Sequence, residues 1–407
     1  MKKRFLLGGL SFLFLAGTAF VVLTKNESKK KPETKSYSLL PRPTALNYTQ
    51  EWQPVKANAT TLAKKIEINS NDIKSMLALA GIYLQEARIT GNYTYYNEAA
   101  MQQIVSVLEK DPENLEALSF KTTILLSKHQ FEEALAIAEE LKQKFPYNAY
   151  VYGMLIDANV ELGKYEAAVE AADKMISIRP DIRSYSRIAY LREIHGDIPG
   201  AIDAMKLAVT AGAPGDENTE WCRVQTGKLY EQWGKMKEAE MQYAIALNNR
   251  ENYPYALAGL ARIATAQKDY TKALSLFQQA DSIIPDHTFK EGIAEIYELT
   301  GEKEKASALA SEILTHMKKL SKTGNEDHEM AHAYMGVNDY DKALEYAMKE
   351  YNRRPANIEA NETVAKVYAE MKDYKNALPF IERALSTNNK NPELLSLAAL
   401  IKERASK

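Results

Sequence analysis

The segment His328-Glu329-Met330-Ala331-His332 has the residue types and the spacing of a zinc-dependent peptidase site. In the pattern H-E-x-x-H on a helix, two histidines one turn apart bind Zn²⁺ and the glutamate acts as the general base. Catalytic zinc also needs a third protein ligand and an open position. Asn338 stands where the extended pattern has its third histidine, so a third ligand would come from the preceding predicted hairpin, which offers Glu291, Glu295 and Glu298 on the same face. A zinc peptidase that uses His328, His332 and Glu295 is therefore the alternative function.

Composition and motif content argue against several other functions. The net charge of −2 argues against a nucleic-acid partner, because nucleic-acid binding usually needs a basic face. The single cysteine, Cys222, excludes an intramolecular disulfide and a zinc site built on several thiolates. The sequence contains neither a P-loop nor a G-x-S-x-G elbow, and we expect no cofactor. His129 and His195 fall in predicted turns, where we expect structural or solvated side chains.

The N-terminus has the pattern of an export signal. Residues 1–4 are basic after the initial methionine, and the run Phe5–Leu23 is apolar and uncharged. The run is 19 residues long, and about 20 apolar residues span a bilayer, so a cleaved signal peptide and an uncleaved anchor both remain open. We expect residues 1–25 to be this signal or anchor and the proline-containing stretch 26–54 to be a flexible linker. The protein would then be exported, either periplasmic or membrane-anchored, with membrane contact only through this N-terminal segment.

The elements that must position these side chains follow an internal repeat. An alanine recurs near the start of every second predicted helix, at intervals of 33 to 38 residues: Ala100, Ala134, Ala168, Ala201, Ala239, Ala273, Ala306, Ala343 and Ala377. A small residue twelve positions earlier lets two helices approach closely, and an aromatic three positions earlier fills the groove beside them. Glycine precedes several of the second helices, where a tight turn requires a positive φ: Gly163, Gly196, Gly234 and Gly301.

These recurring positions resemble the tetratricopeptide-repeat family, whose period is about 34 residues. The resemblance covers residues 73–390 and implies an all-α, right-handed α-solenoid of about nine helical hairpins. We expect a single helix over 55–72 before the solenoid and a capping helix over 391–407 after it, because terminal repeats need such caps. The resemblance also implies a non-enzymatic scaffold or adaptor that binds a peptide or protein partner in a concave groove, and the predicted export signal would place this scaffold at the cell envelope.

The first helix of each hairpin would line that groove. In the middle repeats, the residues that project there combine aromatic and basic groups: Tyr150, Arg183, Arg187, Tyr190, Trp221, Lys228, Tyr255 and Arg262. Trp, Tyr and Arg carry much of the binding energy at protein interfaces. Such a groove would suit an acidic peptide.

The repeat also bears on the zinc pattern. Met330 and Ala331 occupy packing positions of the eighth hairpin, so this helix has a structural reason to exist without a metal. We therefore predict a binding protein rather than an enzyme, with the solvated helix faces of an ordinary solenoid as the alternative to a groove.

Overall fold

The computed structural model describes residues 37–321 and 325–407. The predicted signal or anchor at 1–25 lies outside these ranges, as do residues 26–36 of the predicted linker. None of the helices in the two described ranges has the length and apolar character that a bilayer span requires.

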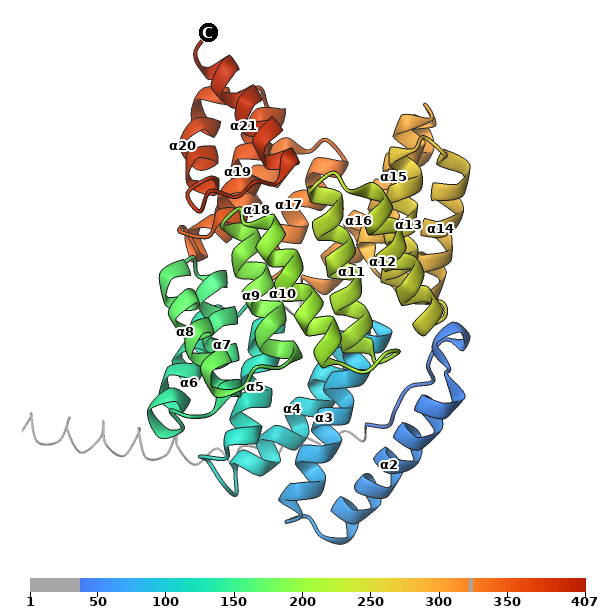
Figure 1. Cartoon of the computed structure of the whole chain (residues 1–407), viewed down its shortest axis with the longest axis vertical. Coiled ribbons are helices and arrows are strands. Elements are labelled where there is room, and N and C mark those ends of the chain that lie inside the picture. The colour runs from blue at the N-terminus through green and yellow to red at the C-terminus, as the bar shows by residue number, and fades with distance from the viewer. Residues whose placement is uncertain (1–36, 322–324) are drawn as a thin grey trace, which may run out of the picture. The chain divides into compact units, whose positions relative to one another are not determined.

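The described chain folds into α-helices, with one short 3₁₀ helix and no strand in these ranges (Figure 1). The first elements are the 3₁₀ helix η1 (Thr44–Leu46) and α2 (Thr49–Ile68). The helices that follow are α3 (Ile73–Thr90), α4 (Tyr93–Leu108), α5 (Leu115–Ser127), α6 (Phe131–Lys144), α7 (Ala149–Glu161), α8 (Tyr165–Ile178), α9 (Ile182–Ile194), α10 (Ile198–Ala211), α11 (Glu217–Gln232), α12 (Met236–Asn249), α13 (Pro254–Ala266), α14 (Tyr270–Ile283), α15 (His287–Leu299), α16 (Lys303–Leu320), α17 (Asp327–Gly336), α18 (Tyr340–Arg353), α19 (Ile358–Glu370), α20 (Tyr374–Ala384) and α21 (Pro392–Ala405).

Helices α3 to α20 pack in consecutive pairs as nine hairpins, numbered here 1 to 9. The recurring alanines lie where these helices meet, and all nine are buried, with exposed fractions between 0 and 4%. At Gly227, one of the small positions, an added Cβ would lie 2.4 Å from the ring of Tyr243. The predicted all-α solenoid and the packing role of its small residues are therefore confirmed.

One residue in each hairpin turn has a left-handed backbone. The predicted glycines occupy this position in four hairpins, with φ between 72° and 81°: Gly163, Gly196, Gly234 and Gly301. Other hairpins place a residue with a side chain at the same position, with φ between 55° and 62°: His129, Lys268, Asn338 and Lys372. Histidine and asparagine tolerate this conformation better than most residues with a side chain.

The segment before the solenoid differs from the predicted linker 26–54 and helix 55–72. Helix α2 begins at Thr49, six residues earlier than predicted, and therefore includes Pro54, which lies past its first turn and removes one intrahelical hydrogen bond. The residues before α2 are packed against the first hairpin. Arg42 is 5% exposed, and its Nη2 donates to Oε1 of Glu86 at 2.6 Å. This buried ion pair docks a segment whose composition alone indicates a flexible chain.

The solenoid coils so that its second turn lies against its first. Hydrogen bonds join residues 193 to 203 positions apart in the sequence. The turn of hairpin 2 meets the loop before hairpin 8, where His129 Nδ1 lies 3.0 Å from the carbonyl oxygen of Asn325. The end of the first helix of hairpin 3 meets the loop before hairpin 9, where Asn357 Nδ2 donates to the carbonyl of Glu161 at 3.1 Å. Each of these turns therefore rests on the loop that precedes the hairpin six further along.

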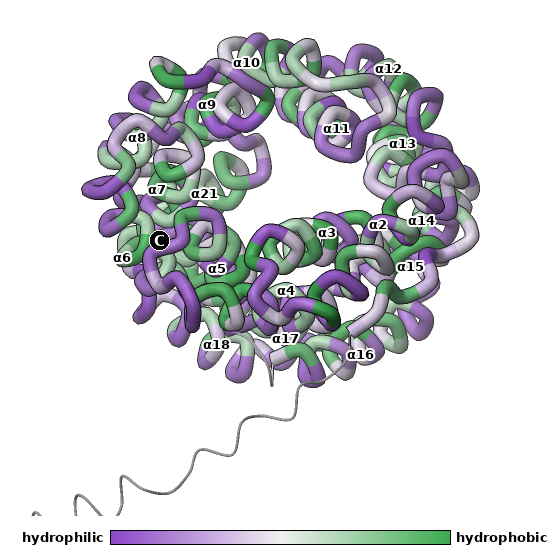
Figure 2. Tube along the Cα trace, turned by 90° about the horizontal axis from the view of Figure 1, so that it is seen from below, coloured by the Kyte–Doolittle hydropathy of each residue, from purple (hydrophilic) through white to green (hydrophobic). Residues whose placement is uncertain are grey.

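Within residues 39–407, the first helix of a hairpin lies on the inner side of the coil and the second helix on the outer side. Figure 2 shows this for the pairs α9 and α10, α11 and α12, and α13 and α14. The predicted capping helix is present as α21, which also lies toward the inside. We call the surface formed by the inward-directed side chains of the first helices the inner face.

Candidate functional site

Two of the predicted groove arginines are paired with carboxylates of neighbouring hairpins. Arg187, on α9, forms a two-point contact with Asp157 of α7, with Nε–Oδ1 and Nη2–Oδ2 distances of 2.8 and 2.6 Å. Arg262, on α13, contacts Glu231 of α11 in the same way, at 3.1 and 2.9 Å. Planar two-point pairs of this kind hold arginine firmly. These two side chains connect neighbouring hairpins and offer little free charge to a partner.

The other predicted groove residues divide into packed aromatics and exposed cations. Trp221 and Tyr255 pack against the hydrophobic core of hairpins 4 to 6. Arg183 is exposed, and its guanidinium lies 5.1 Å from the ring centroid of Tyr150. By surface area, the side chain of Lys228 is exposed. Protein atoms nonetheless surround it across the inner face, and this burial, together with the nearby Arg262, lowers the pKa of Lys228. Arg183 and Lys228 therefore remain the accessible cations of the predicted set.

The eighth predicted residue, Tyr190, lines a pocket between the two turns of the coil. Its hydroxyl donates to Glu359 Oε1 of α19 at 3.1 Å, although the two residues are 169 positions apart. The pocket has a volume of about 130 Å³, and its other walls include Glu193 of α9, Glu362 of α19 and Leu394 of α21. Small-molecule sites usually have volumes of roughly 300–1,000 Å³. This pocket is therefore large enough for one side chain rather than for a cofactor.

The carboxylates of this pocket are poorly compensated. Burial raises the pKa of Glu362 to about 7, and the charge of Glu359 adds to the increase. Burial also raises the pKa of Glu193, against the lowering effects of Gln232, which donates to it at 2.6 Å, and of Lys228. A cation that entered the pocket would favour the charged form of both carboxylates. The chemistry of the pocket thus suits a positively charged group.

Sequence reasoning found Tyr190 but missed the three glutamates. Glu193 lies three residues after Tyr190 on α9, and Glu362 lies three residues after Glu359 on α19, so each pair shares one helix face. That spacing is the local signal for two separate polar patches. Only the contact between the two coil turns combines them into one pocket.

The two histidines of the zinc-like segment lie against Thr363 of the next hairpin. On α17, His328 Nδ1 and His332 Nε2 lie 3.3 and 3.5 Å from the hydroxyl of Thr363 on α19, and the two rings are 4.7 Å apart. Burial lowers the pKa of His332 to about 3, so this imidazole is neutral. In the described ranges, Glu295 is not part of any group of three metal-ligating side chains, whereas Glu329 gathers with other residues. The histidines therefore pack against the next hairpin.

The family assignment follows from sequence as well as from fold. The family described as "Tetratricopeptide repeat" matches residues 225–288 and, separately, residues 358–391. The chain contains tetratricopeptide repeats in these two segments. Proteins of this family are generally non-enzymatic and serve as scaffolds for protein–protein interactions, and this repeat protein has the same architecture.

Similar proteins agree with this assignment. The sequence is 30% identical over 128 residues to human "Tetratricopeptide repeat protein 8", which corresponds to 30% of this chain and 24% of that protein. It is also 30% identical over 141 residues to the mouse protein of the same name, or 33% of this chain and 27% of the other. The chain thus matches about a quarter of the length of these relatives. The structure "Human IFIT1 dimer with PPP-AAAA" covers 80% of this chain and 77% of its own, with 15% identity and a TM-score of 0.52, which shows the fold alone.

Proposed function

We propose that this repeat protein is a non-enzymatic scaffold of the cell envelope that holds an extended segment of a protein partner against its inner face. The observation that carries the proposal is the pocket between α9, α19 and α21, with its three glutamates and one tyrosine. An extended segment on the inner face would place one side chain in this pocket, which takes no larger group.

The partner side chain in the pocket would be a lysine or an arginine. Burial raises the pKa values of Glu193 and Glu362, and the charge of a bound lysine or arginine would favour their ionised forms. The sequence favoured an acidic partner, but two of the arginines on which that expectation depended are paired internally. Acidic residues of the partner would contact the exposed Arg183 and Lys228, so the segment we propose carries both charges.

The location at the cell envelope rests on the N-terminal sequence. The basic start and the apolar run Phe5–Leu23 support export, with either cleavage or anchoring to follow. Cell fractionation, with mass spectrometry of the mature N-terminus, tests this part. Recovery of the full-length chain from the soluble cytoplasmic fraction would contradict it.

The binding proposal is tested by a crosslinking pull-down from the native envelope with the double variant Glu193→Gln/Glu362→Gln. Glutamine keeps the shape of the pocket and removes its charge, so the partner recovered with the unaltered protein should be lost. The control is Glu166→Gln/Glu170→Gln, which removes the same charge from exposed positions on the outer helix α8. Equal recovery of the partner by both double variants would show that the pocket does not bind it.

A further inference from the structure

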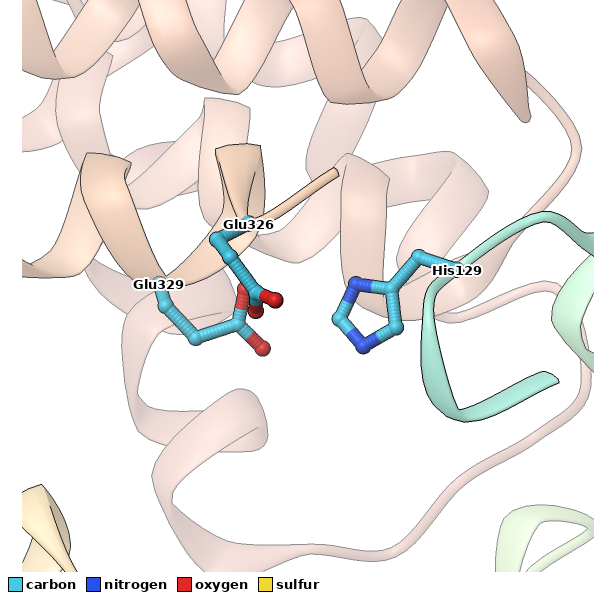
Figure 3. A group of neighbouring side chains, drawn as sticks. All are labelled: His129, Glu326 and Glu329. Atoms are coloured by element: carbon cyan, nitrogen blue, oxygen red, sulfur yellow. The ribbon is translucent and has the colours of Figure 1, made fainter. Parts of the chain in front are cut away.

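A second group of side chains meets at the junction between hairpin 2 and hairpin 8. It consists of His129, in the turn between α5 and α6, and of Glu326 and Glu329, at the start of α17. One ring nitrogen and one oxygen of each carboxylate lie within 4.8 Å of one another. Figure 3 shows both carboxylates facing the imidazole across the junction. The three residues come from different turns of the coil, so no local sequence pattern joins them.

The hydrogen bond of His129 determines which nitrogen is available. Its Nδ1 lies 3.0 Å from the carbonyl oxygen of Asn325, which can only accept, so Nδ1 carries a proton. In the neutral ring, Nε2 is then the nitrogen with a free lone pair. Metal-binding histidines usually donate their other N–H to a carbonyl or carboxylate in this manner. Asn325 Nδ2 also donates to the carbonyl of His129 at 3.3 Å, which fixes the turn that carries the ring.

In the described ranges, the side chains of the two glutamates form no hydrogen bond or ion pair with other residues. Glu326 is the N-cap residue of α17, but its side chain accepts no capping hydrogen bond. Oε2 of Glu329 is buried and has no hydrogen-bond partner. The adjacent Asp327, by contrast, is paired with Arg353. A buried carboxylate oxygen without a partner, beside a second carboxylate, is unfavourable unless a cation joins them.

The geometry points to a divalent metal site formed by His129, Glu326 and Glu329, for which Zn²⁺ is the best-fitting ion. One imidazole and two carboxylates form a zinc ligand set with a fourth position left for water. With zinc bonds of 2.0–2.1 Å, tetrahedral ligand atoms lie roughly 3.3 Å apart, so the three ligand atoms, which lie within 4.8 Å of one another, must close by up to about 1.5 Å. The bound ion would hold hairpin 2 and hairpin 8 together as a clasp between the two turns of the coil.

The position of His129 in the fold agrees with this inference. Five other hairpins have glycine as the left-handed residue of the turn, where glycine is the least strained residue. At the neighbouring junctions the turn residue is a glycine: Gly91 lies beside Pro285, and Gly163 lies beside Ala356. Because glycine has no side chain, these turn residues offer no ligand to a metal ion. The zinc-like segment of the sequence contributes to the site through Glu329 rather than through its two histidines.

Calorimetric titration of the purified, tag-free, chelator-treated full chain with Zn²⁺ alone tests the proposal. The unaltered protein should bind one ion per chain. At free zinc 100-fold above the Kd, its Tm should rise by about 3 °C, given the unfolding entropy of a chain of this size. His129→Gly removes a ligand and installs the residue that other hairpins have there. Since loss of an outer partner of a zinc ligand weakens binding 10–100-fold, this variant should lose at least about 100-fold in affinity, as should Glu329→Gln.

Two control variants make the outcome decisive. Lys268→Gly makes the same change of turn residue in hairpin 6, where it should leave zinc affinity unchanged. His328→Gln tests the H-E-x-x-H pattern directly and should also leave the affinity unchanged. Absence of zinc uptake, or unchanged affinity in His129→Gly, would overturn the proposal. Loss of affinity in His328→Gln with retention in His129→Gly would assign the ion to the two motif histidines instead.

Discussion

Gly163→Ala tests whether the second turn of the coil rests on the first. Gly163 has a φ of 72°, and a Cβ added there would lie 2.3 Å from the carbonyl carbon and 2.5 Å from the carbonyl oxygen of Ala356. Ordinary contacts at such an atom are 3.4–4 Å, so the loop before hairpin 9 must move by about 1 Å. The obstructing atoms belong to the backbone and cannot rotate away.

The control variant is Gly234→Ala. Gly234 has a φ of 74°, and nothing lies within 4 Å of an added Cβ. In this variant, only the left-handed backbone conformation of alanine lowers the free energy of unfolding, by about 1–2 kcal/mol. Gly163→Ala has the same backbone strain and is also overpacked, which lowers the free energy of unfolding by a further amount of about 1–3 kcal/mol. The loss of unfolding free energy in Gly163→Ala, minus the loss in Gly234→Ala, measures the contribution of the contact between the coil turns.

Urea unfolding gives the two free energies, and hydrogen exchange locates the change. The backbone N–H of Ile358 donates to the hydroxyl of Tyr165 at 2.8 Å across the same junction. Its protection should fall in Gly163→Ala and stay unchanged in Gly234→Ala. Equal destabilisation by both variants, with Ile358 equally protected, would refute the stacked coil and with it the pocket and the metal site.

Three further predictions concern packing, docking and pH. Gly227→Ala places a Cβ 2.4 Å from the ring of Tyr243 and should lower the free energy of unfolding in urea by about 1–3 kcal/mol. Arg42→Met leaves Glu86, which is 1% exposed, without its cation and should lower the same free energy by about 3–5 kcal/mol, whereas an undocked segment predicts no change. Glu362 has a pKa of about 7 in the folded chain and 4.5 when unfolded, so its contribution is fully present below pH 4.5 and is lost as pH rises through 7. Glu362→Gln should therefore raise stability at pH 8 by about 1 kcal/mol, after solvent screening, and leave it unchanged at pH 4, below both pKa values; equal effects at both pH values would contradict the shifted pKa.

The features that the sequence predicted correctly all lie within one repeat or between neighbours. Ala168 and Ala239 are buried because each hairpin repeats the same close helix contact, and a period near 34 residues reveals that contact directly. Gly196 and Gly301 have a positive φ for an equally local reason, since the turn is too tight for most other residues. The docking of Arg42 was missed because a proline-rich stretch with one buried ion pair resembles a flexible linker in composition.

The inner-face residues show a second limit of sequence reasoning. Helix phase correctly places Arg187 and Arg262 on first helices, but it does not reveal that Asp157 and Glu231 on the neighbouring hairpins neutralise them. Helix phase identifies which residues share a face, whereas free charge depends on the pairs that form across hairpins. A groove predicted from residue types alone therefore overstates the positive charge available to a partner.

Both the pocket and the proposed metal site depend on the number of hairpins in one turn of the coil. The turns of hairpins 2 and 3 meet the loop before the hairpin six further along, so His129 meets Asn325. The same stacking of the coil turns brings Tyr190 of hairpin 4 to Glu359 of hairpin 9. Small rotations between neighbouring hairpins accumulate to set that number, and no single repeat encodes it. The long interval between Ala306 and Ala343 includes Asn325, which in sequence only lengthens a loop and in the fold orients the imidazole of His129. In this chain, local repeats determine the fold, and the chemistry arises where distant repeats come into contact.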